Sequence, residues 1–313
     1  MLQLRRLVFA LAGSLALATP ALAGKLAIVI DDFGYRPSTE NQVLAMPAEV
    51  SVAVLPNAPH AREMATKAHN QGHDVLIHLP MAPLSKQPLE KDTLRPDMSS
   101  EEIARIIREA VNDVPYAIGM NNHMGSAMTS SLPGMQKVMA ALAHYNLFFL
   151  DSMTIGNSQA MRAAAGTGVK VIKRKVFLDD TQNETDIRYQ FNRAVALARR
   201  NGSAIAIGHP HPSTVRVLQQ MLYSLPPDIT LVRASSLLNE PQVDTSRPNA
   251  APPSQTVPAA PHNPFRGVKL CKPKRQPEPV YATRFFTVIS ESVSESAVVS
   301  YFRHQWQGWG KQS

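Results

Sequence analysis

Acidic and imidazole side chains recur at one kind of place in this sequence, at the ends of short apolar runs typical of buried strands. They are Asp31 and Asp32 after LAIVI, His78 in VLIHLP, His123 after AIGMNN, Asp151 after NLFFL, and His209 and His211 after SAIAIG. Two imidazoles and a carboxylate are a common ligand set for Zn²⁺ and similar divalent ions, and they leave a coordination position open for water. A second carboxylate can accept the proton of that water as it attacks a carbonyl. The pattern therefore predicts a metal site suited to hydrolysis.

Each of these residues also has a structural interpretation. The pair Asp31 and Asp32 could form a solvated turn or a helix cap, and His78 could be a hydrogen-bonded core residue. GHPHPST could be a turn that leads into a helix capped by Ser213, and Asp151 could cap a helix as well. The conjunction of five polar strand ends favours the functional interpretation. Because side chains alternate along a strand, we expect the two adjacent aspartates to point in different directions and to differ in role.

Strand-like runs alternate with helical patterns between residue 25 and about residue 238. The runs are KLAIVI, EVSVAVL, DVLIHL, AIGMNN, NLFFLD, VKVIKRKVFL, SAIAIG and ITLVRA. The clearest helical pattern covers Glu101 to Val111, preceded by a capping box of Ser99 and Glu102, and another covers roughly Asp186 to Arg200. Strands separated by helices indicate a parallel sheet.

Seven or eight such units fit either a closed (β/α) barrel or a large open sheet, and we favour the barrel. Its strands share one C-terminal face, so side chains far apart in the sequence should converge there. Residues 81 to 97 show no clear periodicity, and we expect them to form a long loop over one end of the barrel.

The N-terminal residues 1–23 have the pattern of a signal peptide cleaved before Gly24, with a basic start, a short apolar stretch and Ala21-Leu22-Ala23. We therefore expect an exported, soluble protein with no membrane span after cleavage, periplasmic if the source is a Gram-negative bacterium. Cys271 is the single cysteine, which excludes an intrachain disulfide.

The C-terminal part differs in composition. Residues 241–280 are proline-rich and basic, which is typical of a linker, and residues 281–313 have an amphipathic pattern that a helix or a strand would fit. The net charge of the chain is +8, most of it in this tail and little in residues 24–240. A nearly neutral main domain argues against a nucleic-acid partner, whereas the basic tail could recruit an envelope protein.

The motifs IVIDDFG, VLIHLPM, GMNNHMGS, FLDS and IGHPHPST, in this order from Gly24 to about Leu238, resemble those of the divergent polysaccharide deacetylase family. That family is part of the NodB-like carbohydrate esterase superfamily. The resemblance implies a distorted (β/α) barrel for residues 24–240 and a metal-dependent deacetylase that acts on an acetylated polysaccharide or peptidoglycan, with zinc as the expected ion.

The resemblance also implies roles for individual residues. Asp31 matches the catalytic base, Asp32 a metal ligand and His78 the first histidine ligand. HLPMAPL lacks the usual second histidine one helical turn later, and His123 is the candidate replacement. The remaining matches are Asp151, which would orient the acid histidine, and that acid itself, either His209 or His211.

A protein of a different class remains as an alternative, a non-catalytic scaffold that binds metal or glycan in the cell envelope. Trp306 and Trp309, the only tryptophans, both lie in the tail, so the barrel has no indole on which a sugar ring could stack. Glycan recognition by the barrel would then depend on hydrogen bonds.

Overall fold

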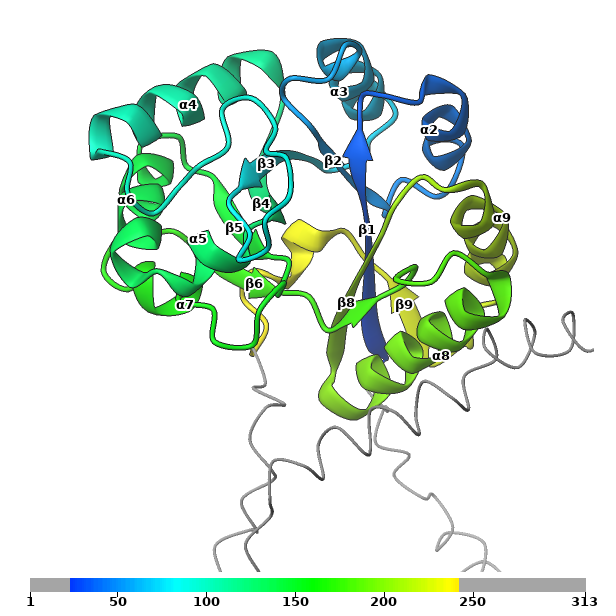
Figure 1. The fold of residues 1–313 in the computed structure, drawn as a ribbon. Helices are drawn as coiled ribbons and strands as arrows, with labels where there is room; N and C mark the ends of the chain where they lie inside the picture. Colours follow the sequence, from blue (N-terminus) through cyan, green and yellow to red (C-terminus); the bar gives the residue numbers. More distant parts are fainter. Residues whose placement is uncertain (1–22, 242–313) are drawn as a thin grey trace, which may run out of the picture. The chain divides into compact units, whose positions relative to one another are not determined.

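The computed structural model describes residues 23–241, and a curved parallel sheet with helices packed outside it forms their centre (Figure 1). The strands are β1 (Gly24–Phe33), β2 (Ser51–Val54), β3 (Val75–Met81), β4 (Gly119–Met124), β5 (Phe148–Asp151), β6 (Val171–Lys173), β7 (Val176–Phe177), β8 (Ser203–Gly208) and β9 (Ile229–Leu231). Their order is β6-β5-β4-β3-β2-β1-β8-β7, and β9 pairs with β1. The strands are parallel, as the alternating pattern predicts, and the sheet is a half barrel that matches the distorted (β/α) barrel implied by the resemblance.

Helices occupy the connections between the strands, as expected for parallel pairing. They are α2 (Pro37–Leu44), α3 (Ala61–Asn70), α4 (Ser100–Asp113), α5 (Ser126–Ser130), α6 (Leu132–Ala143), α7 (Ala160–Ala163), α8 (Glu184–Asn201) and α9 (Pro212–Met221), with the 3-10 turns η1 (Leu222–Ser224) and η2 (Ala234–Leu237). The two helices expected from the sequence are α4 and α8. Ser99 Oγ accepts a hydrogen bond from Glu102 N at 3.1 Å, so the expected N-terminal cap of α4 is present.

Strand β1 shows how the sequence fills both sides of the sheet. Leu26, Ile28 and Ile30 belong to the large core that includes the helices. Ala27 and Val29 instead belong to a smaller cluster of side chains from β2, β3, β5 and β8, closed by η2. Because both faces are buried, the strand is an unbroken apolar run rather than an alternating one.

The run VKVIKRKVFL was expected to form one strand but forms two short strands at opposite ends of the sheet. Arg174 N donates to Asp151 O at 3.0 Å, which continues the pairing with β5. The next residue, Lys175, donates its N–H to Ile205 O at 2.8 Å, which begins the pairing with β8. The chain thus crosses the open side of the half barrel within one residue.

The segment between β3 and α4 is a long loop, as predicted. It folds back on the end of β3, because Leu94 N donates to Pro80 O at 2.9 Å and Ala82 N donates to Leu94 O at 2.8 Å. Leu94 is fully buried and anchors the loop. This anchoring holds the middle of the loop, including Glu90, over the C-terminal ends of the strands.

Several expectations concern other parts of the chain. The signal peptide, apart from its last residue, and the linker and terminal segment after residue 241 lie outside the described residues. Within residues 23–241, no helix has both the length and the apolar character needed to cross a membrane.

Removal of residues 241–313 is expected to leave a cooperative thermal unfolding transition. The proline-rich composition of residues 241–280 is unsuited to building a core, and residues 23–241 contain two clusters of buried hydrophobic side chains. Circular dichroism melts of the mature chain and of a chain ending at Glu240 test this. A fall of more than about 10 °C in melting temperature on truncation would contradict it.

Candidate active site

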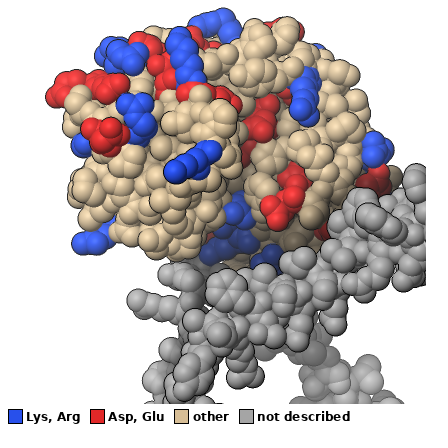
Figure 2. All heavy atoms as spheres, viewed as in Figure 1, with Lys and Arg blue, Asp and Glu red and all other residues tan. Residues whose placement is uncertain are grey.

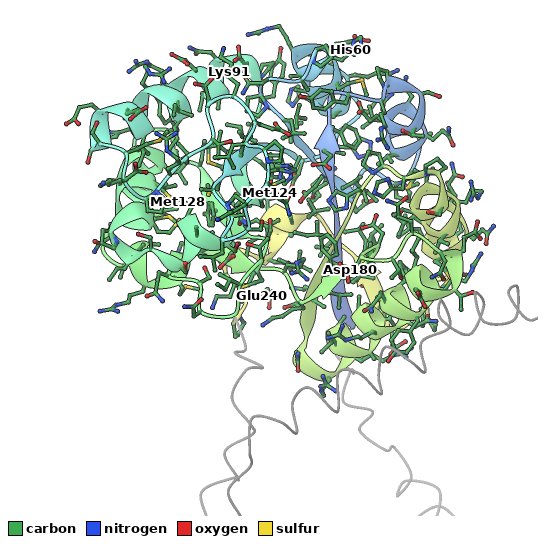
Figure 3. All side chains as sticks on the ribbon, viewed as in Figure 1. His60, Lys91, Met124, Met128, Asp180 and Glu240 are labelled. Carbon is green, nitrogen blue, oxygen red and sulfur yellow. The ribbon has the colours of Figure 1, made fainter. Side chains whose placement is uncertain are left out.

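The C-terminal ends of neighbouring strands bring the predicted residues together. Asp31 and Asp32 lie just before the last residue of β1, Phe33, and His209 directly follows β8, the neighbour of β1 in the sheet. His78 in β3 and His123 in β4 come from adjacent strands whose register pairs His78 with Asn121. Figure 3 labels Met124 at the end of β4 and Asp180 just after β7, and side chains crowd the space between these strand ends.

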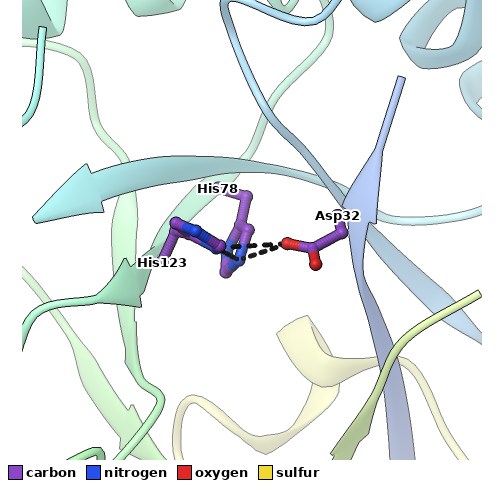
Figure 4. A group of neighbouring side chains, drawn as sticks. All are labelled: Asp32, His78 and His123. Atoms are coloured by element: carbon purple, nitrogen blue, oxygen red, sulfur yellow. Dashed lines mark hydrogen bonds and ion pairs between the residues drawn. The ribbon is translucent and has the colours of Figure 1, made fainter. Parts of the chain in front are cut away.

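Asp32, His78 and His123 form a tight three-residue group (Figure 4). Asp32 Oδ1 lies 3.1 Å from His123 Nδ1 and 3.3 Å from His78 Nε2. The two imidazole nitrogens are 3.0 Å apart. The three potential ligand atoms predicted from the sequence therefore converge on one point.

This triangle has the dimensions of a metal site. A tetrahedral zinc ion with bonds of about 2.0 Å separates its ligand atoms by about 3.3 Å. Asp32 Oδ1 is buried but accepts no well-aligned hydrogen bond, although two imidazoles lie beside it. A cation held by this oxygen and the two imidazoles would satisfy it, and the residues present fit a divalent ion.

Asn121 determines which nitrogen of His78 faces this point. Its Nδ2 donates to Asp31 Oδ1 at 2.8 Å, so its Oδ1 faces His78 Nδ1 at 2.7 Å. His78 Nδ1 must then carry the proton, which leaves the lone pair of Nε2 free to bind an ion. Asn121 was not among the residues predicted from the sequence, although GMNN, the first four residues of β4, could have drawn attention to it.

The two adjacent aspartates do not diverge as expected. Asp31 Oδ2 lies 3.6 Å from the same His78 Nε2 that Asp32 approaches. Asp32 has a left-handed backbone with φ +58°, and the register between β1 and β2 shifts at this point. The bulge turns Asp32 back toward the site, so simple alternation along the strand was the wrong guide here.

The environments of the two carboxylates differ nonetheless. Burial raises the pKa of Asp31, against the opposing effects of His78, His209 and the Asn121 hydrogen bond. Burial also acts to raise the pKa of Asp32, but the His123 and His78 imidazoles outweigh it and hold this pKa far below its usual range. Asp31 is thus the better proton acceptor and Asp32 the better permanent anion.

The carboxylate that holds His209 is Asp179, not Asp151 as expected. Asp179 Oδ1 lies 3.0 Å from His209 Nδ1, and its Oδ2 accepts from His209 N at 2.7 Å and from Thr214 Oγ1 at 2.7 Å. Asp151 Oδ1 accepts from Met153 N at 2.9 Å, which is a local turn contact. A second aspartate pair, Asp179 and Asp180, directly follows the run VKVIKRKVFL and could have indicated this residue. It was overlooked because β6 and β7 were taken as one strand.

His209, rather than His211, faces the candidate metal ligands. Its Nε2 lies 3.9 Å from Asp32 Oδ2. Burial alone would lower the pKa of His209, but Asp179 and then the more distant Asp32 and Asp31 raise it to about 9. His211 precedes α9 and contacts Gln182, and burial lowers its pKa.

Asp179, His209 and His211 also bring three possible ligand atoms within 4.8 Å of one another. Both oxygens of Asp179 already accept hydrogen bonds, from His209 and Thr214. We therefore interpret this second group as a histidine positioned by a carboxylate.

A small pocket of about 170 Å³ opens beside these groups. Its lining includes Asp32, Tyr35, Arg36, Leu55, Glu90, His123, His209, Pro210 and His211. Glu40 holds one wall in place, because its Oε1 accepts from the backbone N–H groups of Tyr35 at 3.0 Å and Arg36 at 2.6 Å. In Figure 2, charged groups of both signs are scattered over this face, with acidic ones in its hollowed middle.

Substituting His123 by Ala is expected to lower affinity for a divalent ion at least tenfold, because one of three protein ligands is lost. Elemental analysis after dialysis against graded chelator measures this. His144→Ala, which removes an exposed histidine from the end of α6, is the control. Undiminished affinity in His123→Ala would show that a different residue completes the site.

Comparison with known proteins gives a consistent result. A family model described as divergent polysaccharide deacetylase matches residues 28–238. The uncharacterized protein YibQ of Escherichia coli K12 is 77% identical over 312 residues, covering 100% of this chain and 97% of that protein. An uncharacterized protein of Haemophilus influenzae is 47% identical over 224 residues, or 72% of this chain and 80% of that protein.

Among solved structures, an uncharacterized protein from Agrobacterium tumefaciens C58 superimposes with a TM-score of 0.64 at 20% identity. The match covers 70% of this chain and 91% of that one. At this identity the likeness concerns the fold alone.

Proposed function

Because the chain belongs to the divergent polysaccharide deacetylase family, with its NodB-like barrel, we propose that it is an exported, metal-dependent deacetylase that acts on an acetylated glycan of the cell envelope or extracellular space. The observation that carries the proposal is the arrangement of the site. A three-residue ligand group is flanked by a buried carboxylate, Asp31, and by a histidine held by Asp179. Export is supported by the signal-like pattern of residues 1–23.

Asp32, His78 and His123 would hold the ion, for which zinc fits the ligand types and spacing. When bound, such an ion lowers the pKa of a coordinated water and polarises a carbonyl oxygen. The reaction is the addition of water to the acetyl carbonyl, followed by departure of the sugar amine or hydroxyl and release of acetate.

Asp31 is positioned to take the proton from the attacking water. The Asn121 hydrogen bond fixes its Oδ1, and its Oδ2 faces the group at 3.6 Å from His78 Nε2. Burial raises its pKa and makes it a stronger base than an exposed aspartate.

His209 is positioned to donate a proton to the leaving group. Asp179 accepts from Nδ1, so the second ring nitrogen, Nε2, faces the ligand group. With a pKa of about 9, the imidazole is protonated at neutral pH and is ready to act as the acid.

The test uses the mature chain from Gly24, stripped of metal and reloaded with Zn²⁺, Co²⁺ or Mn²⁺. Acetate release is measured on a panel of N-acetylated and O-acetylated oligosaccharides. Activity that appears with metal and is lost in His78→Ala is the expected result. Full metal loading without acetate release from any substrate would overturn the enzyme proposal in favour of a non-catalytic metal- or glycan-binding protein.

A further inference from the structure

A second, larger cleft of about 500 Å³ lies on the open side of the half barrel. Its lining consists of Met153, Thr154, Arg174, Lys175, Phe177, Asp180, Gln190 and Arg193. Three of these residues are cationic and one is anionic. Residues 24–240 as a whole are close to neutral, so this concentration of positive charge is unusual for the domain.

The topology explains why the cations gather here. The backbone of Arg174 still pairs with β5, and that of the next residue, Lys175, already pairs with β8. Both residues therefore lie in the gap between the two edges of the sheet. Arg193 comes from α8, which follows β7 in the chain. The cleft therefore lies where the sheet does not close.

Arg174 is held rigidly. Its Nε donates to Ser152 O at 2.6 Å and its Nη2 to Met153 O at 2.9 Å. Its guanidinium lies over the ring of Phe177, 4.9 Å from the ring centroid. The carboxylates of Asp31 and Asp151 favour the charged form of Arg174, whereas the positive charge of Arg193, which also lines the cleft, acts against it.

The cleft adjoins the acid histidine. The ring of Phe177 packs edge-on against His209, with the ring centroids 5.3 Å apart. Phe177 is thus shared between the cleft wall and the candidate active site. A sugar unit in the cleft would lie next to the unit whose acetyl group is attacked.

We propose that this cleft binds the carboxylate of an acidic sugar unit that neighbours the acetylated unit of the substrate. The inference rests on the proposed deacetylase function, which supplies the acetylated unit beside which the acidic sugar would lie. Guanidinium groups pair well with carboxylates, and a fixed Arg174 loses little freedom on binding. The carboxylate could belong to the lactyl ether of a muramic acid that carries no peptide or to a uronic acid, and the chemistry of recognition is the same.

The test measures equilibrium binding by calorimetry at low ionic strength to the mature, zinc-loaded protein in an Asp31→Asn background, in which the chains should bind without being deacetylated. Three tetrasaccharides are compared: neutral chitotetraose, an alternating N-acetylglucosamine–N-acetylmuramic acid chain, and a hyaluronan fragment. At least one acidic chain is expected to bind about tenfold more tightly than the neutral one, and the one that does identifies the source of the carboxylate. This preference should weaken as salt is raised.

Arg193→Gln is expected to reduce the preference about fivefold by weakening only the acidic chains, because one of three cations is removed. Arg193→Lys keeps the charge and should retain most of the preference. Arg200→Gln removes an exposed arginine from the C-terminal end of α8 and is the matched control, expected to bind like the unmodified protein.

Two results would overturn the proposal: equal binding of acidic and neutral chains, or a preference unchanged in Arg193→Gln. Failure of the deacetylase proposal gives a different result. In that case the acidic preference depends on Arg193, and persists in the metal-deficient His78→Ala protein, while no acetate is released. The cleft would then be an acidic-glycan site on a protein without turnover.

Discussion

Replacing Asp31 by Asn is expected to leave metal binding intact and to lower turnover by about 100- to 10,000-fold, the usual range for loss of a general base. The substitution keeps the size of the side chain, and the new amide oxygen can still accept the hydrogen bond from Asn121 Nδ2. It removes the negative charge and with it the ability to take up a proton. Metal content by elemental analysis and acetate release on the same preparation measure the two effects separately.

Asp32→Asn is the matched comparison, one residue away. Asp32 Oδ1 lies within 3.3 Å of both imidazole nitrogens, so its loss should abolish metal binding first and activity as a consequence. The structure makes this a demanding test, because Asp31 also approaches His78 Nε2. If Asp31→Asn lost the ion while Asp32→Asn kept it, the two roles would have to be exchanged.

Replacing Asp179 by Asn is expected to lower turnover about 100-fold and to move the alkaline limb of the pH–rate profile toward neutral pH. Asp179 acts through His209 and so has a positioning role. The acid must be protonated, so activity falls as pH rises through the His209 pKa, which Asp179 helps to raise to about 9. Without this partner the pKa should fall toward the ordinary value of about 6.5.

Asp151→Asn provides the control, since the sequence motifs assigned the same role to Asp151. Its Oδ1 accepts from Met153 N, and the substituted amide oxygen can still accept this bond, so the pH profile should keep its shape. Melting temperature and metal content are measured for both variants, because both aspartates are buried. If the alkaline limb moved toward neutral pH in Asp151→Asn and stayed in place in Asp179→Asn, the sequence-based assignment would be restored.

Local patterns in the sequence were sufficient for the architecture and for the types of residue at the site. Apolar runs bounded by polar residues predicted the parallel strands, and the Ser99 capping box predicted the start of α4. In parallel sheets the strand ends share one face, so Asp32, His78 and His123 could be expected to meet. These inferences succeeded because they depend on periodicities within a few residues of the chain.

Three features of the site depended on contacts between distant segments. The left-handed backbone of Asp32 turns its carboxylate toward His78, against the alternation of β1. Asn121 selects the His78 nitrogen that faces the site, through one bond to each of two other strands. No periodicity in the sequence indicates either effect. The first accompanies a register shift between β1 and β2, and the second is a pair of hydrogen bonds between strands.

The third feature, the position of Asp179, depended on how the strands before it pair in the sheet. The run VKVIKRKVFL is continuous in the sequence, yet its two halves pair with opposite edges of the sheet, and Arg174 and Lys175 change partner from β5 to β8. The apolar pattern specified that these residues are buried strands. The strands with which they pair depend on the curvature of the half barrel. Only in a curved sheet do the two edges come close enough for consecutive residues to pair with β5 and then with β8. The same curvature places Asp179 against His209.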